Sequence, residues 1–142
     1  YVHKDIHLRN VFWTYLRNEL MPHHREAVTF KVGDLGVSRI ETEVQGDRPT
    51  VPWMIAPEVL SPEKFGPVGK PTDIYHAGLV LLAVAMGIEP TFTAEEIVRG
   101  VPQITAEQLS PPYGRAIGRA LCPHLHARPP SAFEFWRLLS LG

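Results

Sequence analysis

The sequence predicts a mainly α-helical fold that carries one small β-hairpin near its amino-terminal end. Two short runs of β-branched and aromatic residues, 11–13 and 28–32, have the composition of paired strands. Beyond residue 56, apolar residues recur at helical spacing, and candidate capping residues stand before several of these runs. We therefore expect the hairpin in the first fifth of the chain and helices with loops in the rest.

Length and composition fit one domain or a part of one. The chain has 142 residues, 44% of them hydrophobic and 20% charged, so we expect a folded core and not a disordered chain. A formal net charge of −1 gives no attraction to nucleic acid or to an anionic membrane, and neither is expected as a partner. No stretch reaches the roughly 20 apolar residues of a membrane span. The single cysteine, Cys122, excludes an intrachain disulfide and favours a reducing compartment, so we expect a cytoplasmic, intracellular protein.

Proline, glycine and charged residues mark three segments as loops. They are 14–27, which connects the two strands, then 39–52 and 61–71. A helix of one or two turns is expected at 56–60.

A central helix is expected at 73–86, because this run is apolar on nearly every face. Asp73 is its expected N-cap and Gly87 its stop. Later helix starts are predicted by capping boxes and a proline pair, namely Thr93–Glu96, a second possible box at Thr105–Gln108, Pro111 with a helix to about Leu121, and Ser131–Glu134.

Three polar residues near the hairpin have the chemistry that phosphoryl transfer requires. Asp5 and Asn10 stand five residues apart on a segment that enters the first strand. Such an Asp accepts the proton of an attacking hydroxyl, and such an Asn offers an amide oxygen to magnesium. Asp34 stands between a strand and a glycine and can supply the main carboxylate for the metal. Gly36 then allows a sharp turn.

The order of these residues resembles that of eukaryotic-type protein kinases. His3, Lys4 and Asp5 followed by Asn10 are similar to the catalytic loop, and Asp34–Gly36 is similar to the Asp-Phe-Gly motif. Three further matches follow in the family's order: Ala56–Glu58, which closes the activation segment, Asp73–Gly78 at the start of the central helix, and Ala127–Pro129 with its late arginine.

The resemblance implies that residues 1–142 are a partial protein kinase domain, the large lobe from the catalytic loop onward, whose parent fold is α+β. The activation segment would span about 34–58 and the helical lobe 73–142. The implied activity is transfer of the γ-phosphate of ATP, with Mg²⁺ as cofactor, to a hydroxyl of a protein substrate.

The resemblance also gives roles to individual residues. Asp5 would be the catalytic base, and Asn10 and Asp34 would bind Mg²⁺. Phe12 would lie beneath the adenine ring, and His7 would stand near the transferred phosphate. Two structural groups are implied as well: a packed column of His3, Leu35 and Asp73, and a buried ion pair between Glu58 and Arg128.

The sequence departs from the family pattern at several places. Lys4 replaces the usual arginine, and Asp47 stands about where many kinases carry a phosphorylated residue, which raises the hypothesis of activation without phosphorylation. His7 replaces the lysine typical of serine/threonine kinases, whereas Arg9 is typical of tyrosine kinases. Trp53 fits the serine/threonine form but Val51 does not, so both acceptor classes stay open.

Two alternatives stand beside an active protein kinase. One is a pseudokinase or remnant that acts as a protein-binding module. The other is a small-molecule phosphotransferase of the aminoglycoside type. His7 is similar to a histidine in the catalytic loop of that family, but the family lacks the Ala-Pro-Glu and late arginine features. The histidines at 23, 24, 76, 124 and 126 fit no standard zinc spacing, so surface or satisfied core histidines are expected.

The glycine-rich loop, the strand lysine and its glutamate partner do not occur in these 142 residues. We therefore expect a fragment that is inactive alone and whose small lobe lies upstream. We also expect part of 77–86 to face water, because the helix that covers it in the family is missing.

Overall fold

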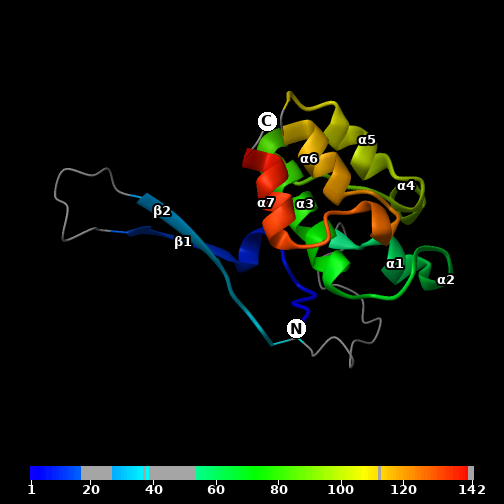
Figure 1. Cartoon of the computed structure of the whole chain (residues 1–142), viewed down its shortest axis with the longest axis horizontal. Coiled ribbons are helices and arrows are strands. Elements are labelled where there is room, and N and C mark those ends of the chain that lie inside the picture. Colours follow the sequence, from blue (N-terminus) through cyan, green and yellow to red (C-terminus); the bar gives the residue numbers. More distant parts are fainter. Residues whose placement is uncertain (17–26, 37, 39–53, 112, 141–142) are drawn as a thin grey trace.

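The computed structural model of the chain has a helical body from which a two-stranded hairpin projects (Figure 1). The described residues are 1–16, 27–36, 38, 54–111 and 113–140. Their elements, in chain order, are η1 Leu8–Asn10, β1 Val11–Leu16, β2 Ala27–Val32, α1 Pro57–Leu60, α2 Pro62–Phe65, α3 Lys70–Met86, α4 Ala94–Val98, α5 Val101–Glu107, α6 Tyr113–Ala120, η4 Leu125–Ala127 and α7 Ala132–Ser140. The prediction of a mainly helical fold with one small antiparallel hairpin is confirmed.

Helix α3 lies at the centre of the body, as its apolar sequence predicts. It packs against α6, which also contacts α5 and α7. Gly78 allows α3 and α6 to approach closely, because a Cβ there would lie 3.1 Å from the Cβ of Ala120. The largest cluster of buried side chains consists of Met54, Ala56, Tyr75, Leu79, Val80, Leu82, Ala83, Ala106, Ile117 and Leu121. The core is thus built around one helix.

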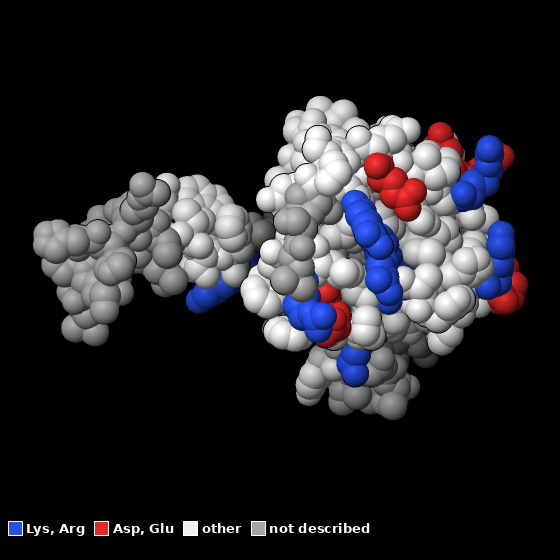
Figure 2. Space-filling model, turned by 45° about the horizontal axis from the view of Figure 1, so that its top comes forward, with Lys and Arg blue, Asp and Glu red and all other residues white. Residues whose placement is uncertain are grey.

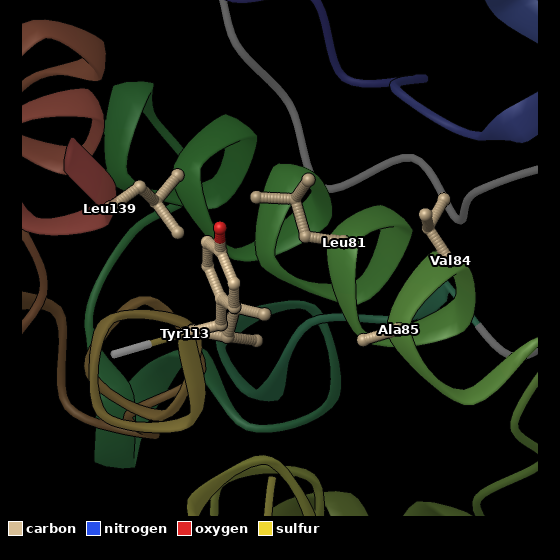
Figure 3. A pocket seen from close by; sticks show the side chains of 6 residues that line it. Leu81, Val84, Ala85, Tyr113 and Leu139 are labelled. Carbon is tan, nitrogen blue, oxygen red and sulfur yellow. The ribbon is translucent and has the colours of Figure 1, made fainter. Parts of the chain in front are cut away.

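The carboxyl end of α3 is exposed, as expected for part of 77–86. Val84 is 63% exposed and Met86 37%. Beside them, α3, α6 and α7 enclose an apolar pocket of about 320 Å³, lined by Leu81, Val84, Ala85, Tyr113, Ile117 and Leu139. Figure 3 shows Tyr113 lying between Leu139 and Leu81 at this space, with Val84 farther along α3 and pointing away from Tyr113. We call it the α3–α6–α7 pocket.

The hairpin strands pair where the sequence predicts, and they are longer than predicted. Strands β1 and β2 are antiparallel, with Val11 opposite Val32 and Leu16 opposite Ala27. The pairing extends three residues beyond the expected first strand, because Thr14 and Tyr15 continue its β-branched and aromatic composition.

The predictions for segment 61–71 and for Thr105 are wrong. Segment 61–71 is not a continuous loop, since it contains α2 and the first residues of α3. Proline caused this first error, because it occupies the first positions of α2 and α3 and is well tolerated there. Thr105 does not open a helix either. It lies inside α5, and its hydroxyl donates to the carbonyl of Val101 at 2.9 Å.

Three other helix signals are confirmed. The capping box of Thr93 and Glu96 opens α4, and the hydroxyl of Ser131 accepts the N–H of Glu134 at the start of α7. Gly87 ends α3 in the left-handed conformation. In the part of the chain that the structure describes, no helix is long and apolar enough to cross a membrane.

Candidate active site

Asp73 anchors the segment that carries Asp5 to the central helix. Its two carboxylate oxygens accept the backbone N–H groups of His3 at 2.7 Å and Lys4 at 2.9 Å. Asp73 is not the N-cap predicted from the sequence, because α3 begins earlier, after Gly69, whose N–H donates to the hydroxyl of Thr72. Because the Asp73 carboxylate does not cap the helix, it is available to accept the N–H groups of two successive residues of the loop.

His3 links the same loop to the end of β2. Its Nε2 lies 3.0 Å from the carbonyl oxygen of Gly33, and its Nδ1 accepts the N–H of Asp5 at 3.3 Å. These two contacts place the ring proton on Nε2, because a carbonyl can only accept. Two members of the predicted column, His3 and Asp73, are joined by the backbone N–H of His3, whereas the His3 ring contacts Gly33 and Asp5.

The prediction for the third member of that column, Leu35, is wrong. Leu35 is 69% exposed and does not complete a packed column with His3 and Asp73. The loop is held by hydrogen bonds to Asp73 and Gly33, so no apolar plug from Leu35 is needed to fix it.

Asp5, His7 and Asn10 converge on one carboxylate oxygen. The amide nitrogen of Asn10 donates to Oδ2 of Asp5 at 3.1 Å and to the Asp5 carbonyl at 3.0 Å. Nδ1 of His7 accepts the N–H of Arg9 at the start of η1, so the proton of the neutral ring is on Nε2, 3.4 Å from the same Oδ2. The side chain of Asp5 is 12% exposed. Both neighbours thus contact the same oxygen of Asp5, Oδ2.

The backbone brings Asp34 beside this group. The N–H of Gly33 donates to the carbonyl of Asn10 at 2.8 Å, so Asp34 follows directly on a residue bonded to the loop. Oδ1 of Asp34 accepts the N–H of Gly36 at 3.2 Å in a tight turn. Asp34 itself is exposed. The sequence-predicted acid, amide and metal carboxylate therefore lie in one region of the molecule.

Left-handed backbone marks both motifs. Among the described non-glycine residues, Lys4 (φ 69°) and Asp34 (φ 60°) have positive φ. Such conformations cost about 1 to 3 kcal/mol each and cluster at functional sites. Each lies next to a residue that the sequence singled out, which supports the choice of these two segments.

The donor chemistry suits a magnesium ion that is held mainly by phosphates and water. No group of three or more His, Cys, Asp or Glu side chains able to hold a metal occurs among the described residues. Mg²⁺ seldom uses such a cage, since it keeps several waters and takes one or two protein oxygens. The NH₂ of Asn10 is bound to Asp5, so its amide oxygen and the exposed carboxylate of Asp34 are the two protein oxygens that would hold such an ion.

Phe12 and Gly33 form a contact that sequence reasoning passed over. Phe12, predicted to lie beneath adenine, is 57% exposed, and its ring closely approaches Gly33. A Cβ at position 33 would lie 2.6 Å from Cε2 of Phe12, so only glycine fits against the ring as it stands. The signal in the sequence is the glycine that directly precedes Asp34.

The predicted ion pair between Glu58 and Arg128 is present and buried. Nη1 and Nη2 of Arg128 each donate to one carboxylate oxygen of Glu58 at 2.8 Å, and both side chains are 0% exposed. Burial raises the pKa of Glu58, but the hydrogen bonds and charge of Arg128 and a hydrogen bond from Thr72 outweigh it, so the pKa lies below its ordinary value. The pair joins the Ala-Pro-Glu turn to the segment before α7.

Buried polar atoms without partners distinguish His76 from the other histidines. His76 is 1% exposed, and neither ring nitrogen has a hydrogen-bond partner among the described residues. The hydroxyl of neighbouring Tyr75 is likewise buried and unpartnered there. His124 and His126 are exposed, as expected, but His76 is a core histidine without a hydrogen-bond partner among the described residues.

Because the imidazole of His76 is buried, we expect the folded protein to lose stability in weak acid. Burial lowers the pKa of its imidazole, and the negative charge of Asp73 opposes this without reversing it. The unfolded chain therefore binds a proton near pH 6.5 that the folded chain does not, so the free energy of unfolding should fall as the pH drops below about 6.5, by at most about 1.4 kcal/mol per unit. Urea unfolding of His76→Leu should lack this component, and exposed His126→Leu should retain it. An unchanged slope in His76→Leu would contradict the assignment.

Several predicted positions lie outside the described residues. They are the loop segment 39–52 with Asp47 and Val51, then Trp53, and the histidines at 23 and 24. Lys4, the proposed counterpart of Asp47, is buried.

No protein-family model matches the chain, and no solved structure matches it significantly. The kinase-like interpretation of the site thus depends on the chain's own residues and their geometry.

Proposed function

We propose that this chain provides the base and the metal ligands of an ATP-dependent protein kinase that phosphorylates a serine, threonine or tyrosine hydroxyl. The observation that carries the proposal is the orientation of Asp5. The amide of Asn10 donates to Oδ2, and Nε2 of His7 lies 3.4 Å from the same oxygen, so the carboxylate is held in one position. A carboxylate held in this way accepts the proton of the attacking hydroxyl without first having to reorient.

In this proposal Asn10 and Asp34 hold Mg²⁺ through their side-chain oxygens. When bound, the ion neutralises charge on the phosphates of the nucleotide. The hydrogen bond from Gly33 to Asn10 keeps the two ligands next to each other, and the contacts of Asp73 and His3 keep the loop beside β2. The resemblance implies that the rest of the phosphate clamp, a glycine-rich loop and the lysine that pairs with a helix glutamate, lies outside these 142 residues.

A protein-binding module is the second candidate. The exposed apolar side chains of the hairpin and the α3–α6–α7 pocket favour it, since large apolar patches mark interaction sites. A module of this kind has no need of Mg²⁺-dependent nucleotide binding, so that property separates the two candidates.

Asp34→Asn should weaken Mg²⁺-dependent ATP binding by at least about tenfold, the lower end of the loss found when a group supporting a metal is removed. Titration calorimetry with ATP, in the presence of Mg²⁺ or EDTA, measures this affinity. It is done on the full-length polypeptide, by which we mean the natural protein that contains residues 1–142. Glu63→Gln is the matched control, because Glu63 is an exposed carboxylate on α2. ATP binding that ignores both Mg²⁺ and Asp34 would favour the module and contradict the kinase.

A further inference from the structure

The pairing register of the hairpin gathers apolar side chains on one of its faces. Because side chains alternate along a strand, opposite pairs two residues apart share a face. The pairs Val11–Val32, Trp13–Phe30 and Tyr15–Val28 therefore lie together, and their members are all apolar or aromatic. We call this set of six the apolar hairpin face. The other face carries the pairs Phe12–Lys31 and Thr14–Thr29.

Five of the six side chains of the apolar hairpin face are largely exposed, and the sixth, Val11, packs against the core of the helical body. The exposed fractions are 61% for Trp13, 67% for Phe30, 53% for Tyr15, 46% for Val28 and 48% for Val32. Figure 1 shows the hairpin projecting from the helical body, with no helix over it. A two-stranded hairpin is marginally stable alone in water, so a partner surface would stabilise it.

The composition of the apolar hairpin face favours an apolar partner. None of its six residues is charged, and the one charged residue of the described strands, Lys31, lies on the other face. In Figure 2 the described part of the hairpin is mostly uncharged, whereas acidic and basic side chains are spread over the helical body. A charged partner group would be buried here without a counterpart, which is costly.

The apolar hairpin face of a second copy is such an apolar partner, and its area is sufficient for association. An aromatic side chain offers about 150 to 250 Å², so the exposed fractions sum to roughly 500 Å² per copy. Two copies would bury about 1,000 Å², the lower limit for a specific interface. Sheets stack face to face about 10 Å apart, and a two-fold axis lets one surface contact itself. The net charge of −1 opposes such pairing only weakly.

We propose that two copies of this chain associate by stacking the apolar hairpin face of one against that of the other. The opposite hairpin face, which carries Phe12, takes no part in this association. It does not depend on the proposed kinase activity, because no residue of the face belongs to the group formed by Asp5, Asn10 and Asp34.

Sedimentation velocity of the chain over a range of concentrations tests the proposal. The wild type should show a monomer–dimer equilibrium, and Phe30→Glu should raise its dissociation constant at least tenfold, because the carboxylate would be buried unpaired. Thr14→Glu places the same charge on the other face of the hairpin and should leave the equilibrium unchanged. Val84→Glu places it at the α3–α6–α7 pocket and should also leave it unchanged.

A fluorescence measurement keeps the test valid if Phe30→Glu fails to fold. With Trp53 and Trp136 replaced by Phe, Trp13 is the remaining tryptophan, and its emission should shift to the blue as dimers form. A wild type that stays monomeric at about 100 μM, far above a micromolar affinity, would overturn the proposal. Dissociation by Val84→Glu with no effect of Phe30→Glu would also overturn it, because the pocket would then be the interface.

Discussion

Replacing Arg128 with Met is expected to lower the free energy of unfolding by about 3 to 5 kcal/mol, the usual cost of removing one partner of a buried ion pair. All five N–H donors of this guanidinium are used. Two bind Glu58, and the others bind the carbonyls of Pro71, Cys122 and Pro123. Methionine would leave a buried carboxylate and three carbonyls without these donors. Urea unfolding followed by circular dichroism measures the loss.

The double variant Glu58→Leu with Arg128→Met separates the pair from its surroundings. Removing both charges should cost less than the sum of the single changes, because the penalty of an unpaired buried charge disappears. Arg99→Met is the surface control: its pair with Glu95 is 3.7 Å long and largely exposed, so its loss should change stability by less than about 1 kcal/mol. An equally small effect of Arg128→Met would show that the buried pair does not hold these segments together.

The pH dependence of the pair has its own window. Since the pKa of Glu58 is lowered in the folded state, its contribution is fully present above the ordinary value of 4.5 and is lost as the pH falls through the folded value. The contribution of His76 changes at higher pH, near 6.5. The two groups are therefore distinguishable in one titration of stability against pH.

Asp5→Asn should reduce the rate of phosphoryl transfer by the full-length polypeptide about 10²- to 10⁴-fold, the usual contribution of a general base. Asparagine has the same size and can still accept the hydrogen bond from Asn10, so the loop should keep its shape. The loss should consequently appear in kcat, with little change in KM for ATP. Steady-state kinetics with labelled ATP measures both constants.

A conservative change at a carboxylate outside the candidate site controls for indirect effects. Glu63→Gln alters an exposed acid on α2 and should leave kcat unchanged. If Asp5→Asn kept kcat within a factor of two of the wild type, Asp5 would not be the base, whatever its contacts with Asn10 and His7.

The sequence predicted best those features that depend on short-range pattern or on a matched motif. The hairpin followed from two β-branched runs, and the pair of Glu58 and Arg128 followed from the resemblance, although 70 residues separate them. Helix α3 was expected from its apolar run, but its start was misplaced because Pro71 looked like a loop residue. Proline permits both a loop and a first helical turn, and only the surrounding packing decides between them.

The errors at the site have a similar cause. Leu35 was expected to pack because an apolar residue stands there in the family, yet its exposure is a property of the whole fold. The contact between His7 and Asp5, the approach of Phe12 to Gly33 and the unsatisfied ring of His76 also depend on tertiary geometry. Spacing in the sequence singled out Asp5, Asn10 and Asp34, but not the contacts that hold the Asp5 carboxylate.

Phosphate transfer by the full-length polypeptide tests the central claim most directly. The polypeptide is incubated with Mg²⁺ and ATP labelled at the γ-phosphate, and label on protein hydroxyls is measured with and without EDTA. We expect acid-stable label on serine, threonine or tyrosine that requires Mg²⁺ and is lost in Asp5→Asn. Label that forms equally in EDTA or in Asp5→Asn, or no transfer to any protein hydroxyl, would contradict it.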